Sequence, residues 1–176
     1  AVTVATYQSV TGSGSAGQQE LIQQSENVLG GTKADLDVYP HQIAFNILPH
    51  VDDFLTGGYT KEEQKMLNES RKILHDESLR VSATCVRVPV EISHSESLQI
   101  EFESNVEVND AKQVLSEYDG VLVVDDPSRN EYPMPLAATG GDDVLVGRIR
   151  KDTAHENGLA LWLSCDNLRK GAALNA

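Results

Sequence analysis

Residues 11–21 read TGSGSAGQQEL, and the way the chain continues from this stretch decides the fold class. Its glycines have the spacing G-x-G-x-x-G of a dinucleotide-binding turn: Gly12, Gly14 and Gly17. The apolar residues 2–8 are typical of a strand, and residues 18–29 are typical of a helix. A dinucleotide-binding unit then needs a second parallel strand that ends in an acidic residue. Residues 32–42 are polar and contain a proline, so the sequence favours an ordinary strand-to-helix turn eased by glycine.

Beyond this stretch, strands and helices follow one another without regular alternation. A capping box, with Thr60 at the N-cap and Glu63 three residues later, predicts a helix over residues 61–74. Asp110 is the expected N-cap of a second helix over residues 111–118. Further strands are expected at residues 81–90, 98–102, 121–124, 144–149 and 159–163. The sequence therefore predicts an α+β domain whose mixed, largely antiparallel sheet has helices on one face and a second face free for a partner.

Composition and charge limit the classes of partner. A chain of 176 residues with 40% hydrophobic content can bury one core, which predicts one domain. The 27 acidic and 14 basic residues give a net charge of −13, and no basic cluster is present, so nucleic acid and anionic membranes are not expected partners. The absence of a membrane-spanning apolar run or targeting signal predicts a cytoplasmic protein. Cys85 and Cys165 are interpreted as buried thiols.

Arg87 and His94 are the first candidates for a functional role. In the strand over residues 81–90, Arg87 lies on the face opposite the valines. Such an arginine is either an edge-strand charge or an anion receptor, and the position alone favours the edge charge. His94 follows a predicted turn that would bring it back towards Arg87, although a single histidine is more often structural.

Two other patterns are weaker. Glu62 and Lys65 are adjacent on the surface of the first predicted helix, where the ordinary interpretation is a solvated ion pair. No histidine has a histidine or cysteine three or four residues away, so no metal site is predicted.

Taken together, several longer motifs resemble a known family. They are TYQSVTGSG (6–14), YTKEEQKM (59–66), VSATCVRVPV (81–90), HSES (94–97), DDPSRNEYPMPLAATGGDDVLVGRIRKD (125–152) and ENGLALWLSCDNLRKGAALNA (156–176). The chain resembles the C-terminal half of aspartate-semialdehyde dehydrogenases over nearly its whole length. The resemblance implies that residues 1–176 form the catalytic and dimerisation domain, with the fold of the C-terminal domain of glyceraldehyde-3-phosphate dehydrogenase. The NADP-binding domain and the catalytic cysteine would precede Ala1, so this fragment alone is expected to be inactive.

The resemblance also implies a reaction and a substrate site. The family reduces aspartyl phosphate with NADPH, or oxidises aspartate semialdehyde and captures phosphate, in the biosynthesis of lysine, threonine and methionine. By the resemblance, Arg87 would bind the substrate carboxylate, and its planar guanidinium suits a bidentate contact. His94 would be the acid/base. Gln8 would orient the intermediate, Glu62 would contact the substrate ammonium and Lys65 would help to bind phosphate.

Cofactor and partner expectations come from the same resemblance. Thr11, Gly12 and Asn167 would contact NADP, which the missing N-terminal domain would bind in the main, and the G-x-G-x-x-G spacing would be a coincidence. A homodimer is expected. Two alternatives remain: a stand-alone, non-catalytic dimerisation module of this fold, and a domain like that of N-acetylglutamyl-phosphate reductase. The spacing from Arg87 to His94 and the pair of Glu62 and Lys65 favour the aspartyl enzyme over the reductase.

Overall fold

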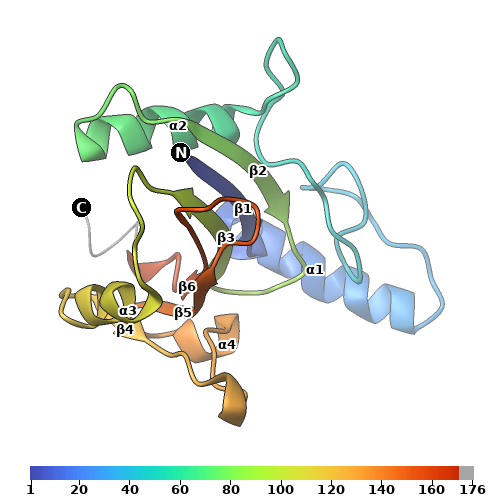
Figure 1. Ribbon diagram of the computed structural model, residues 1–176. Helices are drawn as coiled ribbons and strands as arrows, with labels where there is room; N and C mark the ends of the chain where they lie inside the picture. Colours follow the sequence, from blue (N-terminus) through green and yellow to red (C-terminus); the bar gives the residue numbers. More distant parts are fainter. Residues whose placement is uncertain (171–176) are drawn as a thin grey trace.

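The sheet is built around β1, which pairs in parallel with one neighbour and antiparallel with the other. The computed structural model describes residues 1–170 (Figure 1). Six strands form one sheet in the order β2-β1-β3-β6-β5-β4. Their bounds are β1 (Val2–Gln8), β2 (Val81–Arg87), β3 (His94–Glu101), β4 (Val121–Val123), β5 (Val144–Lys151) and β6 (Gly158–Cys165). The β1–β2 and β4–β5 pairs are parallel and the pairs between them antiparallel, which confirms the predicted mixed, largely antiparallel sheet.

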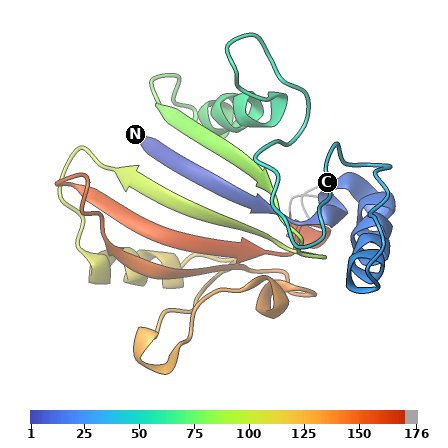
Figure 2. The same ribbon diagram turned by 90° about the vertical axis from the view of Figure 1, so that its right-hand side faces the viewer.

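The helices are distributed unevenly around this sheet. They are η1 (Val10–Ser13), α1 (Gly14–Leu29), α2 (Lys61–Leu74), α3 (Val108–Ser116), η2 (Pro127–Arg129) and α4 (Pro135–Ala138). Figure 2 shows α2 and α3 behind the sheet, on the same face, and α1 beyond the carboxyl end of β1. α2 packs on β2, and α3 packs on β4 and β5. The prediction that helices cover one face is therefore confirmed for α2 and α3.

The glycine-rich stretch is a strand-to-helix connection, as expected, but it is more helical than predicted. η1 follows β1 almost directly, and α1 begins at Gly14 rather than at Gln18. Gly14 has a φ of +78°, which a residue with a side chain rarely adopts, and this conformation lets η1 pass into α1 without a loop. The strand parallel to β1 is β2, which follows only after α2 and the irregular residues 30–60. The compact dinucleotide-binding unit is therefore not formed here.

Several predicted boundaries were wrong. β2 ends at Arg87 rather than at residue 90, because Pro89 has no N–H to donate to a neighbouring strand. β3 begins at His94 rather than at Leu98, since its first residues are polar but still pair with β1 and β6.

Other elements also differ from their predicted spans. Glu107 is the N-cap of α3, so Asp110 lies in the first helical turn and is not the cap. β4 is one residue shorter than predicted, whereas β5 and β6 are longer at their ends.

A cluster of buried apolar side chains lies at the carboxyl end of β1. Its members are Val10, Leu21, Tyr39, Ile43, Ala44 and Leu48. Gln24 of α1 holds the irregular segment against this cluster: its Nε2 donates to the Asp35 carbonyl at 2.7 Å, and its Oε1 accepts from the Ile43 N–H at 2.8 Å. Buried backbone groups need hydrogen-bond partners, and the Gln24 side chain provides them for two backbone groups of this segment.

The predicted capping box starts α2. Thr60 Oγ1 accepts from the Glu63 N–H at 3.3 Å, and Glu63 Oε2 accepts from the Thr60 N–H at 2.8 Å. The other carboxylate oxygen of Glu63 accepts from the Cys85 N–H at 3.0 Å. One buried carboxylate therefore both starts α2 and fixes it to β2.

Strand register assigns side chains to two faces of the sheet. Gln8 is paired with Arg87, and both lie with His94 on the side of α2 and α3, which we call the helix face. The open face is the other side, and it presents Thr3, Ala5, Tyr7, Ser97, Gln99 and Trp162. Residues 132–135, Arg148 and Arg150 adjoin Ser97 and Trp162, so this face is only partly free. The rings of Tyr7 and Trp162 pack there with their centroids 5.1 Å apart.

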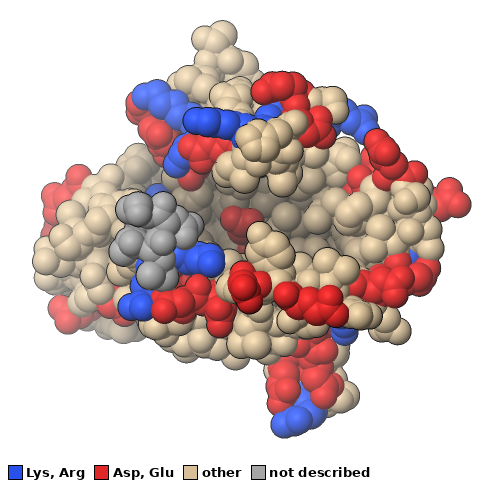
Figure 3. Space-filling view, turned by 90° about the vertical axis from the view of Figure 1, so that its left-hand side faces the viewer, with Lys and Arg blue, Asp and Glu red and all other residues tan. Residues whose placement is uncertain are grey.

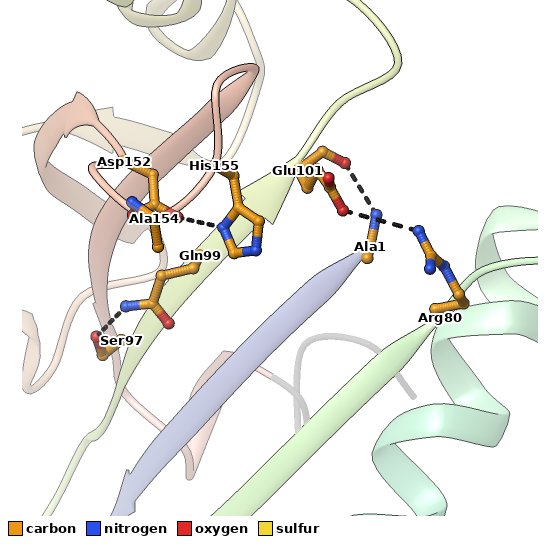
Figure 4. A network of polar contacts seen from close by, with 8 residues as sticks. All are labelled: Ala1, Arg80, Ser97, Gln99, Glu101, Asp152, Ala154 and His155. Atoms are coloured by element: carbon orange, nitrogen blue, oxygen red, sulfur yellow. Dashed lines mark hydrogen bonds and ion pairs between the residues drawn. The ribbon is translucent and has the colours of Figure 1, made fainter.

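The space-filling view of the helix face shows a hollow between α2 and α3, with charged side chains along its rims (Figure 3). At the amino end of β1 the surface is held by polar contacts (Figure 4). Arg80 pairs with Glu101 at 3.7 Å, and His155 Nδ1 lies 2.8 Å from an oxygen of Asp152. These contacts lie at the opposite end of β1 from the residues with predicted functional roles.

Candidate active site

A cleft of about 650 Å³ opens at the carboxyl ends of β1 and β2, beside the first turn of α2. All eight residues with predicted roles line it: Gln8, Thr11, Gly12, Glu62, Lys65, Arg87, His94 and Asn167. Strand pairing explains part of this arrangement, because Gln8 and Arg87 are the paired last residues of two parallel strands. The remaining residues come from η1, α2, β3 and the turn after β6.

Arg87 is the buried cation of the cleft. β2 is an edge strand, but the Arg87 side chain is only 6% exposed, so the interpretation as a solvated edge charge was wrong. Its Nη1 donates to the Ser9 carbonyl at 2.6 Å. Among residues 1–170 no carboxylate lies within ion-pair distance of the guanidinium. Burial lowers the pKa of Arg87, while Tyr39 and Glu62 work in the opposite direction.

His94 presents one ring nitrogen to the protein and the other to the cleft. Nδ1 lies 3.0 Å from the backbone nitrogen of Ser9, whose N–H can only donate, so Nδ1 of the neutral ring carries no proton. The proton is therefore on Nε2. Burial, together with the charge of Arg87, lowers the pKa of His94 to about 4, which keeps the ring neutral near pH 7.

Gln8, Glu62 and Lys65 form a polar wall. Gln8 Nε2 donates to Glu62 Oε1 at 3.2 Å, and Lys65 Nζ lies 3.6 Å from Glu62 Oε2. The expected helical ion pair exists, with the Lys65 side chain 56% exposed and that of Glu62 23% exposed. Because the pair lines the cleft, it is also placed to meet a ligand of mixed charge.

Gly12 provides space at the centre of the site. A methyl group added there would lie 2.6 Å from Arg87 Nη1 and 3.4 Å from His94 Nε2. Contacts below 3.0 Å require movement, so a side chain at this position would displace the end of the Arg87 side chain from its place in the cleft. A ligand group can therefore approach the backbone of Gly12 closely, between the guanidinium and the imidazole.

Thr11 and Asn167 form the edge of the cleft nearest to η1. Thr11 Oγ1 lies 3.3 Å from Asn167 Oδ1 and 3.2 Å from Asn167 Nδ2. Asn167 Oδ1 also accepts from the Ser93 N–H at 2.9 Å, which fixes the orientation of the amide. The Asn167 Nδ2 donor is thus directed away from Ser93, at the boundary of the cleft.

Sequence reasoning missed four lining residues and one supporting residue. The lining residues are Val51, Asp52, Leu168 and Lys170. Asp52 lies in an irregular segment with no periodic signal, whereas Lys170 belongs to a motif already quoted and could have been singled out as a second cation. The supporting residue is Ser9, which is fully buried and contacts His94, Thr11 and Asn167.

Neither cysteine has the properties of a nucleophile. Cys85 is buried on the helix face, as predicted, whereas Cys165 is only partly buried, and neither lines the cleft. Burial, with nearby carboxylates, raises the pKa of each thiol to about 11. Thiols are weak nucleophiles when protonated, so both remain unreactive near pH 7.

The part of the chain that the structure describes shows neither a metal-ligand cluster nor a membrane-spanning helix. Within residues 1–170, no three His, Cys, Asp or Glu side chains converge closely enough to bind a metal ion. In the same part of the chain, no helix combines the length and apolar character needed to cross a bilayer.

The cleft therefore combines a buried guanidinium, a neutral imidazole and two ammonium groups with two carboxylates. Guanidinium groups bind carboxylates in a bidentate manner, and a neutral Nε2–H donates to a carbonyl oxygen. In a chain of net charge −13, these local cations offset repulsion of an anionic ligand. The arrangement suits a small ligand that carries a carboxylate, an ammonium group and a reactive carbonyl.

Known proteins share both this sequence and this fold. The family model described as semialdehyde dehydrogenase, dimerisation domain, matches residues 1–170. The aspartate-semialdehyde dehydrogenase of Aquifex aeolicus is 52% identical over 176 residues, which cover 99% of this chain and 52% of that protein. The structure of aspartate semialdehyde dehydrogenase II from Vibrio cholerae, complexed with ASA, has a TM-score of 0.95 at 42% identity and covers 99% of this chain and 51% of that one.

A more distant structure shares the fold as well. The aspartate semialdehyde dehydrogenase of Candida albicans, solved with NADP, has a TM-score of 0.64 at 25% identity and covers 98% of this chain and 46% of that one. The chain spans about half the length of the relatives it matches. Its match to the family model covers almost all of its residues, and its sheet is that of their C-terminal domains. The chain therefore belongs to the semialdehyde dehydrogenase dimerisation-domain family.

Proposed function

We propose that this chain is the substrate-binding half of an aspartate-semialdehyde dehydrogenase. The observation that carries the proposal is Arg87, a buried guanidinium that faces the cleft without a carboxylate partner among residues 1–170. A buried charge without a partner is costly, so a site of this kind is built for an anionic ligand. The named activity of the relatives, on a semialdehyde of aspartate, supplies such a carboxylate.

We propose roles for the remaining cleft residues, and their positions support these roles. Glu62 would meet the substrate ammonium, and Lys65 would meet phosphate. Gln8 has an amide group bound to Glu62, from which it can orient the reacting carbonyl. As the neutral ring, His94 donates a hydrogen bond from Nε2–H to an oxygen of the reacting centre. As the imidazolium, it gives its Nε2 proton to that oxygen, remains as the neutral Nδ1–H ring and takes a proton back at Nε2 later in the cycle. The thiol that attacks the substrate belongs to the other half of the protein.

We propose that the complete protein uses NADP. Gly12 leaves room for a ligand where a methyl group would meet Arg87 and His94, and Thr11 and Asn167 offer hydroxyl and amide groups beside it. When bound, NADP accepts or supplies the hydride. These residues would hold only its reactive end, and the other half of the protein would bind the rest.

We also propose that the complete protein is a homodimer assembled through the open face. The family model is that of a dimerisation domain. The open face presents two packed aromatic rings, which are only half-buried in the single chain. A sheet face with half-buried aromatic rings is typical of an isologous interface. Sedimentation equilibrium of the complete protein tests this, and a monomer at micromolar concentration contradicts it.

The activity is tested with the full-length protein that contains this domain. We expect NADPH formation from aspartate semialdehyde plus phosphate, and at least a hundredfold slower formation from N-acetylglutamate semialdehyde, because an acetylated nitrogen carries no charge for Glu62. His94→Ala and Arg87→Ala should each remove most of this activity. A folded, dimeric protein without turnover would support a non-catalytic module, and preference for the acetylated substrate would support the reductase.

A further inference from the structure

Ser9 contacts His94 with two different groups, both at Nδ1 of the ring. Its backbone N–H and its hydroxyl Oγ each lie 3.0 Å from Nδ1 of the imidazole. Ser9 is fully buried, so water does not compete for either contact. The backbone N–H would be present with any residue except proline at this position, whereas the hydroxyl depends on serine.

The hydroxyl has a second partner. Ser9 Oγ lies 3.1 Å from Asn167 Oδ1, which is identified as an oxygen because it accepts from the Ser93 N–H. Thr11 Oγ1 also lies 3.1 Å from Ser9 Oγ. A hydroxyl has one proton to donate but two lone pairs to accept with. Ser9 can therefore donate to His94 or to Asn167, but not fully to both.

The two protonation states of His94 make different demands on this hydroxyl. When the ring is neutral, Nδ1 is an acceptor and the Ser9 O–H can donate to it. When the ring is an imidazolium, Nδ1 carries a proton, and Ser9 Oγ must accept that proton's hydrogen bond while its own O–H turns to Asn167 Oδ1. The amide N–H of Ser9 cannot make this change, because it only donates.

We propose that Ser9 is a positioning residue whose hydroxyl turns between His94 Nδ1 and Asn167 Oδ1, and so couples the protonation of the imidazole to the state of Asn167. This inference rests on the proposed acid/base role of His94. It adds that a cofactor bound at Asn167 changes the stability of the His94 imidazolium, and that the Ser9 hydroxyl transmits this change.

The charged side chains around His94 affect how readily its ring takes up a second proton. Arg87 from β2, Lys65 from α2 and Lys170 after β6 bring positive charge to the cleft, and Glu62 and Asp52 bring negative charge. Arg87 is the charge that most strongly opposes a proton on His94, while the Ser93 backbone favours it. A hydrogen-bond acceptor at Nδ1 offsets part of the destabilisation of the imidazolium that the Arg87 charge causes.

The relay is tested at pH 7 by the nitrogen resonances of the His94 imidazole, in this chain and in the full-length protein. In Ser9→Ala the amide still holds the Nε2–H tautomer, but Nδ1 loses a donor, and its resonance should move towards that of a free imidazole nitrogen. In Asn167→Ala the hydroxyl can donate fully to Nδ1, and the resonance should move the opposite way. The double variant should match Ser9→Ala, because the Asn167 effect reaches His94 only through the hydroxyl.

Ser95→Ala is the matched control. Ser95 is also buried and adjoins His94 in sequence, but its hydroxyl donates to Ser164 on the open face, and Ser164 contacts the His94 backbone carbonyl and not the ring. Its removal should leave the His94 resonances unchanged. Shifts of the same sign in Ser9→Ala and Asn167→Ala, or an additive double variant, would overturn the relay.

Kinetics of the full-length enzyme provide the second readout. Losing one hydrogen bond to the imidazolium, worth about 0.5–1.5 kcal/mol, should lower kcat about 2- to 10-fold in Ser9→Ala, with KM for the semialdehyde unchanged. An unchanged kcat, or a change confined to KM, would overturn the role in catalysis. Failure of the proposed function is a separate result, since it would appear as undiminished activity in His94→Ala, whereas the resonances report the relay whether or not turnover occurs.

Discussion

At the scale of single residues, Arg87 shows why burial changes the meaning of a sequence pattern. On an edge strand an arginine is ordinarily a solvated charge, yet here the side chain points to the helix face and is enclosed by Ser9, Gly12 and the cleft. Replacing Arg87 with lysine keeps the charge but loses the planar pair of donors. We expect Arg87→Lys to lower kcat/KM of the full-length enzyme about 10- to 100-fold, since hydrogen bonds to charged groups contribute about 1.5–3 kcal/mol. Wild-type kcat/KM in this variant would contradict a bidentate contact.

A substitution at Gly12 tests whether activity needs the space between Arg87 and His94, without changing any charge. Gly12→Ala should greatly reduce activity without unfolding the chain, because the added methyl group meets the ends of the Arg87 and His94 side chains, which can move aside only by leaving their places in the cleft. Gly30→Ala, at the end of α1, adds the same methyl group 3.2 Å from the nearest atom and far from the cleft in sequence. Activity assays on both variants decide the matter, and equal losses would mean that the cleft is not the reason.

His94 predicts how stability depends on pH. Its folded-state pKa of about 4 lies below the ordinary value of 6.5, so the unfolded chain binds the proton more readily. The stability contributed by the neutral ring is complete above about pH 6.5 and is lost as the pH falls towards 4. The difference corresponds to an upper value of about 3 kcal/mol. Urea unfolding of wild type and His94→Gln should show a steeper decline in this window for wild type, and parallel curves would contradict the prediction.

At the scale of elements, the sequence predicted strands and helices where a local signal exists. The capping box set the start of α2 correctly, because both of its hydrogen bonds are made within four residues. The start of β3 was missed because its polar residues are stabilised by pairing with β1 and β6, which no local pattern records. The irregular chain before α2 could not be predicted either, since Glu20 and Gln24 hold it through bonds that join distant residues.

The same contrast applies to the site. Register carries Gln8 and Arg87 to adjacent strand ends, so their proximity follows from a parallel β1–β2 pair. The roles of these residues came from a family resemblance and not from spacing. Neither the sequence spacing nor the family resemblance singled out Ser9, because its importance depends on a contact to His94, which is 85 positions away in the sequence.

Glu63 tests how α2 is attached to the sheet. Both of its carboxylate oxygens accept from backbone N–H groups, one in the cap and one on β2. Glu63→Gln places an amide donor against one of these N–H groups, which we expect to cost about 1–3 kcal/mol of unfolding free energy. Glu69→Gln, at an exposed position of the same helix, is the control. Equal midpoints in urea would show that the carboxylate is not the attachment.

At the scale of the whole molecule, charge and shape separate the two faces of the sheet. The helix face carries α2, α3 and the residues of the cleft, which line it with charged groups, whereas the open face presents aromatic and small polar side chains. A net charge of −13 disfavours association of two copies unless the contact surface itself carries little charge. Strand β1 of the open face meets this requirement, since it presents Thr3, Ala5 and Tyr7, whereas Arg148 and Arg150 lie beside Ser97 and Trp162.

A single carboxylate at the centre of the open face should therefore weaken the dimer. Ala5 is paired with Ser97 on β3 and with Thr84 on β2, and across a two-fold interface Ala5→Glu would add one negative charge to each copy. Every 1.4 kcal/mol of repulsion raises Kd about tenfold, and like charges in an interface cost several kcal/mol. Sedimentation equilibrium of the full-length protein should show a Kd at least about tenfold higher for Ala5→Glu, with far-ultraviolet circular dichroism unchanged. Ser104→Glu adds the same charge at an exposed turn after β3 and should leave Kd as it is. If Ala5→Glu dimerises as tightly as the control, the two copies meet through another surface, and the aromatic pair of Tyr7 and Trp162 does not form the interface.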